Sequence, residues 1–136
     1  MKTLIVEDDF TSRLLLQELL RSHGPTHVAV NGLEAVDAVN DALDEDEPYD
    51  LICLDIMMPE MDGQQALHRI RALEKSRGIL EGWGAKVLMT TALSDKDNVM
   101  GAFREMADGY LVKPIAKDKL LGYLKRLELV APGAGV

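Results

Sequence analysis

The sequence has little of what marks secreted, membrane-spanning or nucleic-acid-binding proteins. It holds one cysteine, which excludes an intramolecular disulfide. Basic residues are few: 15 Lys and Arg stand against 23 Asp and Glu, giving a net charge of −8 that disfavours direct binding to nucleic acid or to an anionic membrane. No apolar run approaches membrane-spanning length, and the N-terminal MKTLIVEDD meets acidic residues too soon for a signal peptide. These absences predict a soluble, cytoplasmic protein.

What the chain does have is a regular alternation of short apolar runs and amphipathic segments. Its 136 residues, 47% of them hydrophobic, are enough for one domain with a proper core. The apolar runs predict strands at Thr3–Val6, His27–Val30, Leu51–Leu54, Lys86–Ala92 and Gly109–Val112. Helical spacing of leucine and alanine predicts helices at Thr11–Gly24, Leu33–Leu43, Gly63–Arg77, Asp95–Ala107 and Ala116–Leu129.

This order of elements predicts an α/β fold with a doubly wound parallel sheet. Strands that alternate with helices form right-handed βαβ units, and apolar strands fit a sheet that helices cover on both faces. In such sheets, ligands bind outside the carboxyl ends of the strands. The single cysteine, Cys53, lies within the third strand, where we expect a buried and inert thiol.

Polar side chains gather where the predicted strands end. Glu7, Asp8 and Asp9 follow the first strand, and Asp55 ends the third. The fourth strand ends in two threonines, and Lys113 follows the fifth. Crowded carboxylates repel one another unless a cation joins them, and oxygen ligands of this kind suit Mg²⁺. A hydroxyl and an ammonium group beside that cation suit a phosphoryl group, with a carboxylate as its acceptor.

Four stretches of the chain together resemble the receiver domain of bacterial two-component response regulators. They are the acid pair Asp8-Asp9, the segment LDIMMPEMDG around Asp55, the segment TTA that ends at Ala92, and GYLVKP. The resemblance runs from Lys2 to about Leu129 and implies a flavodoxin-like (CheY-like) fold with strand order 2-1-3-4-5. We therefore expect a single receiver domain over residues 1–129 and a short C-terminal tail over residues 130–136.

The resemblance implies a phosphoacceptor and a metal site. Asp55 would accept the phosphoryl group as an aspartyl phosphate. Asp8, Asp9 and Asp55, with the backbone carbonyl of Met57, would hold Mg²⁺. The family takes its phosphoryl group from a histidine, so the expected partner is a sensor histidine kinase or a histidine phosphotransfer protein.

The resemblance also implies a switch. Thr91 and Lys113 would bind phosphoryl oxygens, and the Lys113-Pro114 peptide is expected to be cis. Tyr110 would turn inward as Thr91 moves toward the phosphoryl group. The output would be contact with an unknown downstream protein, and the chain would be a monomer or a weak dimer through the face formed by residues 95–107, 109–112 and 116–129. No enzyme activity beyond self-phosphorylation and self-dephosphorylation is expected.

Several alternatives stay open at this point. The chain could be a pseudo-receiver that only binds, or the receiver half of a longer regulator whose output domain is absent. Asp8 or Asp9 taken alone could simply cap the first helix. Met57 and Leu93 stand two residues after Asp55 and Thr91, where many receivers have polar side chains, which predicts slow self-dephosphorylation.

Overall fold

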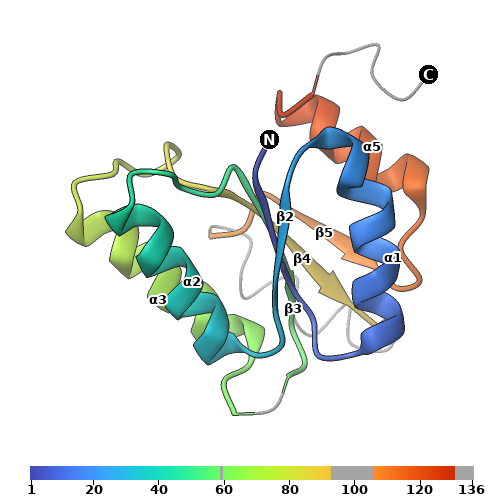
Figure 1. Cartoon of the computed structure of the whole chain (residues 1–136), viewed down its shortest axis with the longest axis horizontal. Helices are drawn as coiled ribbons and strands as arrows, with labels where there is room; N and C mark the ends of the chain where they lie inside the picture. The colour runs from blue at the N-terminus through green and yellow to red at the C-terminus, as the bar shows by residue number, and fades with distance from the viewer. Residues whose placement is uncertain (59, 93–105, 131–136) are drawn as a thin grey trace.

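The computed structural model describes residues 1–58, 60–92 and 106–130 (Figure 1). Its strands are β1 (Thr3–Val6), β2 (Thr26–Ala29), β3 (Leu51–Asp55), β4 (Lys86–Thr91) and β5 (Gly109–Val112). Its helices are α1 (Phe10–Leu20), the short 3₁₀ helix η1 (Arg21–His23), α2 (Gly32–Asp44), α3 (Gly63–Ser76) and α5 (Lys117–Arg126). The helix expected over residues 95–107 lies, except for its last two residues, outside the described part.

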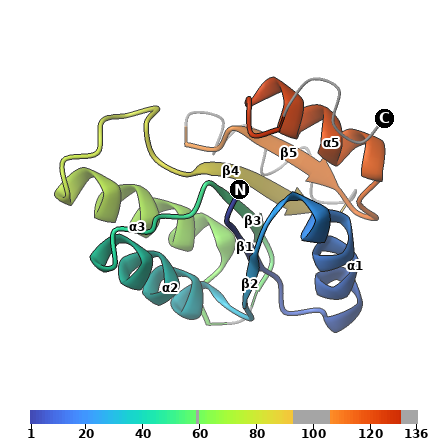
Figure 2. The same cartoon turned by 45° about the horizontal axis from the view of Figure 1, so that its top comes forward.

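The five strands form one parallel sheet in the order β2-β1-β3-β4-β5, which confirms the predicted fold class and strand order. Helices α2 and α3 cover one face of the sheet, and α1 and α5 cover the other (Figure 2). Successive strand residues point to opposite faces. In β1, Leu4 and Val6 therefore join the core under α2 and α3, whereas Ile5 joins the core under α1 and α5.

The edge strand β2 departs from the expectation that every strand is covered on both faces. Among the strands that the structure describes it pairs only with β1, and His27 and Val28 are exposed. Its range also begins and ends one residue earlier than the hydrophobic pattern predicts, because Thr26 pairs with Thr3 and Val30 lies beyond the ladder. The core strands β1 and β3 are buried along their whole length, as their continuous apolar runs indicate.

Side-chain caps and a close backbone approach fix where the helices begin. Asp9, Asn31 and Asp62 each accept a hydrogen bond from the backbone N–H three residues ahead, at the starts of α1, α2 and α3. At the start of α3, a Cβ on Gly63 would collide with the carbonyl oxygen of Asp55, so only glycine lets the helix begin this close to the end of β3. None of the described helices has the length and apolar character needed to cross a membrane.

Candidate functional site

Asp55 is the last residue of β3 and lies at the carboxyl edge of the sheet, between β1 and β4. Its exposed fraction is 3%, although it carries a carboxyl group. Oδ1 accepts a hydrogen bond from the backbone N–H of Met57 at 3.3 Å. The strand thus holds the carboxyl group in a fixed place, as a nucleophile requires.

Two further carboxylates converge on Asp55. One oxygen from each of Glu7, Asp8 and Asp55 lies within 4.8 Å of the other two. Glu7, the residue after β1, is fully buried, whereas Asp8 is exposed. The expected cluster of carboxylates is present, but Glu7 occupies the place that the sequence assigned to Asp9.

Asp9 instead caps α1. Its Oδ2 accepts a hydrogen bond from the backbone N–H of Ser12 at 2.9 Å, and this bond holds the pKa of Asp9 below its usual value. The side chain therefore serves the first turn of the helix, and the geometry does not place it among the metal-ligand candidates. The signal that distinguishes Glu7 from Asp9 was the helix start: Asp9 stands directly before the helical run and is a favourable N-cap.

Lys113 reaches the same cluster from the end of β5. Its ammonium nitrogen lies 2.6 Å from Oε1 of Glu7 and 3.3 Å from Oδ1 of Asp55. Its backbone N–H donates to the carbonyl oxygen of Thr91 at 2.8 Å, which extends the β4–β5 pairing by one bond. The Lys113-Pro114 peptide is cis, as predicted.

These contacts couple the charges of Glu7, Asp55 and Lys113. Burial raises the pKa of Asp55 to about 7, and the neighbouring Glu7 adds to this rise while Lys113 opposes it. Burial alone would raise the pKa of Glu7, but its hydrogen bond with Asp55 and the Lys113 ammonium outweigh burial and lower it. Burial would lower the pKa of Lys113, but the two carboxylates outweigh burial and raise it. In the absence of a metal ion, Asp55 is therefore the group that takes up a proton as the pH falls below about 7, and Glu7 stays ionised there.

The donor set fits a hard divalent cation. It consists of carboxylate oxygens, with no thiol or imidazole nitrogen in the group. Oε1 of Glu7 is buried, and the Lys113 ammonium group lies against it at 2.6 Å. Three carboxylate groups this close together offer the oxygen ligands that Mg²⁺ prefers. Glu7, Asp8 and Asp55 could therefore hold such an ion.

The roles of the remaining predicted residues stay predictions. The Thr91 hydroxyl is buried at the end of β4 and donates to the carbonyl oxygen of Ala92 at 3.1 Å. Met57 is 63% exposed beside Asp55. Tyr110, in β5, is half-buried and packs against the core under α2 and α3. Leu93 lies outside the described residues.

Comparison with known proteins decides the family. The model of the response regulator receiver domain matches residues 3–125. The chain belongs to the response regulator receiver family. This receiver is 36% identical to the chemotaxis protein CheY of Listeria monocytogenes, over 93% of this chain and 97% of that protein. It is also 36% identical to the transcriptional regulatory protein ZraR of Klebsiella oxytoca, over 86% of this chain but only 24% of that protein.

A solved structure resembles this receiver as well. The receiver domain of the sensor histidine kinase PA1611 from Pseudomonas aeruginosa has 27% sequence identity and a TM-score of 0.72, and the match covers 93% of this chain and 95% of that one. That structure has a magnesium ion coordinated in its active-site cleft. Receivers are signalling domains rather than classical enzymes, and the family occurs both in response regulators and in histidine kinases.

Proposed function

We propose that this receiver accepts a phosphoryl group on Asp55 from a phosphohistidine of a sensor kinase or a histidine phosphotransfer protein. The proposal rests on one observation. Two carboxylates and one ammonium group converge on the buried carboxyl group of Asp55. These groups meet at the carboxyl edge of a parallel sheet, which is where ligands bind in folds of this class. A phosphoryl-transfer site needs this arrangement.

The transfer needs Asp55 in its ionised form. A carboxylate oxygen of Asp55 attacks phosphorus, a P–O bond forms as the P–N bond to the donor histidine breaks, and the released imidazole takes up a proton. The product is an acyl phosphate on Asp55. Lys113, 3.3 Å from Oδ1, is placed to bind an oxygen of the incoming phosphoryl group, and the Thr91 hydroxyl is the second candidate for this role.

Glu7, Asp8 and Asp55, with the backbone carbonyl of Met57, are the residues that we propose hold Mg²⁺. The bound ion supplies positive charge that offsets the charge of the carboxylates and of the phosphoryl oxygens. In this proposal Glu7 replaces Asp9, because the Asp9 carboxylate already caps α1.

The signal would leave through β5 and α5. Phosphorylation can change the output only if the phosphoryl group binds one conformation better than another. Thr91 and Lys113 end the neighbouring strands β4 and β5, and Tyr110 lies three residues before Lys113 in β5. We propose that Thr91 and Tyr110 form the switch and that a downstream protein reads the surface around β5 and α5.

The test is phosphorylation by acetyl phosphate with Mg²⁺, followed by intact-mass spectrometry. The unmodified protein should gain one phosphoryl group, and Asp55→Asn should gain none. Asp62→Asn is the matched control, since Asp62 lies in the same connection and asparagine preserves its cap on α3. Equal labelling of Asp55→Asn would refute the assignment. No labelling of the unmodified chain by this donor or by a phosphohistidine protein would favour a pseudo-receiver that only binds.

A further inference from the structure

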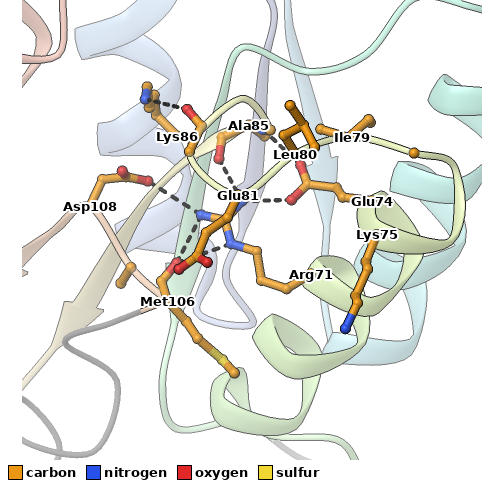
Figure 3. A pocket seen from close by; sticks show the side chains of 14 residues that line it. Arg71, Glu74, Lys75, Ile79, Leu80, Glu81, Ala85, Lys86, Met106 and Asp108 are labelled. Atoms are coloured by element: carbon orange, nitrogen blue, oxygen red, sulfur yellow. Dashed lines mark hydrogen bonds and ion pairs between the residues drawn. The ribbon is translucent and has the colours of Figure 1, made fainter.

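Arg71, in α3, joins three parts of the molecule at the amino ends of β4 and β5 (Figure 3). An arginine has five N–H donors, and all five are used here. Nε and Nη2 donate to the carbonyl oxygen of Met106 at 3.0 and 2.8 Å, and Nη1 donates to the carbonyl oxygen of Ala85 at 2.8 Å. Nη1 also donates to Glu74 at 2.8 Å, and Nη2 to Asp108 at 3.3 Å.

The two carboxylates extend this network into β4. Oε2 of Glu74 accepts a hydrogen bond from the backbone N–H of Ala85 at 2.7 Å. Oδ2 of Asp108 accepts from the backbone N–H of Val87 at 2.8 Å, and the backbone N–H of Asp108 donates to the Val87 carbonyl at 2.8 Å. The guanidinium therefore holds together α3, the beginning of β4 and the residues that lead into β5.

Arg71 also forms part of the wall of a cavity of about 630 Å³ beside the connection from α3 to β4. An anion-binding site would need the guanidinium to offer free donors to a ligand. Protein oxygens already occupy every donor of Arg71, and its side chain is only 23% exposed. Arg71 therefore links structural elements to one another and does not form a ligand site.

Arg71 holds together the two strands, β4 and β5, that carry the phosphoryl-binding half of the candidate site. The metal-ligand candidates come from the ends of β1 and β3, but Thr91 ends β4 and Lys113 follows β5. Strand β5 is a four-residue edge strand, and within the described residues β4 is its only partner in the sheet. A ladder this short leaves the placement of β5 dependent on what holds its two ends. Lys113 donates to Thr91 at one end, and the Arg71 network holds the other.

We propose that Arg71 is a positioning residue for phosphoryl binding: from the opposite edge of the sheet, it sets the register and spacing of β4 and β5, and so of Thr91 and Lys113. This inference rests on the proposed phosphoacceptor function. Lysine cannot replace arginine here, because a single ammonium group lacks the planar fork that binds two carbonyls and two carboxylates together.

The experiment compares two affinities in the same variants. Mg²⁺ affinity, measured by calorimetry, reports on the ends of β1 and β3. Beryllofluoride, a mimic of the phosphoryl group, is titrated at saturating Mg²⁺ and followed by fluorine NMR, and its affinity reports on Thr91 and Lys113. The variant is Arg71→Lys. The matched control is Arg77→Lys, because Arg77 binds Asn40 and Asp44 and so joins α3 to α2 without touching β4 or β5.

We expect Arg71→Lys to bind Mg²⁺ as the unmodified protein does and to bind beryllofluoride roughly tenfold more weakly, since small misplacements of reacting groups have effects of this size or more. Arg77→Lys should leave both affinities unchanged. The unchanged Mg²⁺ affinity shows that the variant is folded.

Two results would overturn the inference while the proposed function stands. In one, Arg71→Lys melts at a lower temperature but keeps both affinities, so that Arg71 only stabilises the fold. In the other, both affinities fall together, so that the effect is not confined to β4 and β5. A different result, in which the unmodified protein binds no beryllofluoride, would refute the proposed function itself and the inference with it.

Discussion

The ammonium nitrogen of Lys113 lies 2.6 Å from Oε1 of Glu7, and the Glu7 side chain is fully buried. Two opposite charges this close neutralise each other, which makes the burial of Glu7 tolerable in the absence of a metal ion. Glu7 is also one of the three residues of the candidate metal group. We therefore expect Lys113 and a divalent cation to compete for the Glu7 carboxylate.

This competition predicts that removing the ammonium group strengthens metal binding. In Lys113→Met, a side chain of similar length without charge, Mg²⁺ affinity should rise roughly tenfold, which corresponds to about 1.4 kcal/mol. The reason is that the metal no longer displaces a bound cation or lies beside one. Calorimetry well above pH 7, where the carboxyl groups are ionised in both proteins, provides the measurement. Equal or weaker binding by the variant would show that Lys113 does not compete.

The next prediction separates Glu7 from Asp9 as the metal ligand. Glu7→Gln should weaken Mg²⁺ binding at least roughly tenfold, because it removes one ionised ligand from a site of three carboxylates. Asp9→Asn should bind Mg²⁺ nearly as well as the unmodified protein, and asparagine caps a helix as well as aspartate does. Mg²⁺ titrations monitored by NMR would measure both. If Asp9→Asn lost as much affinity as Glu7→Gln, the original assignment of Asp8 and Asp9 would be restored.

A third prediction concerns pH. The pKa of Asp55 is raised to about 7 in the metal-free protein, so below this pH a bound proton must leave before the metal can bind. Mg²⁺ affinity should be nearly constant above about pH 7 and should fall as the pH drops below it, by up to about tenfold per unit. The pKa of Glu7 is lowered, so Glu7 stays ionised through this range.

Calorimetry in buffers of different ionisation enthalpy would count the protons released. One proton should leave per Mg²⁺ bound below about pH 7, and fewer above it. Asp55→Asn, which has no such proton, should bind Mg²⁺ more weakly but without this dependence on pH. If the Mg²⁺ affinity of Asp55→Asn still fell with pH, the proton would belong to another group.

Much of the fold is predictable because each element carries its own periodicity. The continuous apolar runs of β1 and β3 and the leucine spacing of the helices were enough to predict a parallel sheet. The strand order was implied only by the resemblance to the receiver family. Asp55 could be singled out as a candidate from the sequence, because burying a carboxyl group at the end of a strand is costly unless another group pairs with it. The choice among Glu7, Asp8 and Asp9 was not, because three consecutive acids look alike until the end of β1 and the cap of α1 are placed.

Arg71 shows a second limit of the sequence. An arginine among polar residues of an amphipathic helix is ordinarily a solvated side chain. Its partners Ala85, Met106 and Asp108 stand 14, 35 and 37 residues further along the chain, and two of these three contacts are to backbone carbonyls. Every residue has a backbone carbonyl group, so no sequence pattern predicts which carbonyl groups an arginine will bind.

The last prediction concerns the lifetime of the aspartyl phosphate. The acyl phosphate is lost when water attacks phosphorus in line, and a polar side chain that orients this water speeds the attack. Met57 stands beside Asp55, is 63% exposed, and has no group that can orient water well. We expect Met57→Asn to lose its phosphoryl group roughly three- to tenfold faster, because the amide can hold a water molecule near phosphorus. Met57→Leu keeps the position apolar and should decay at the original rate. The decay of phosphorylated protein with Mg²⁺ present, followed by intact mass over time, gives all three rates. If Met57→Asn and Met57→Leu decayed alike, the side chain at this position would not control the access or the orientation of the attacking water.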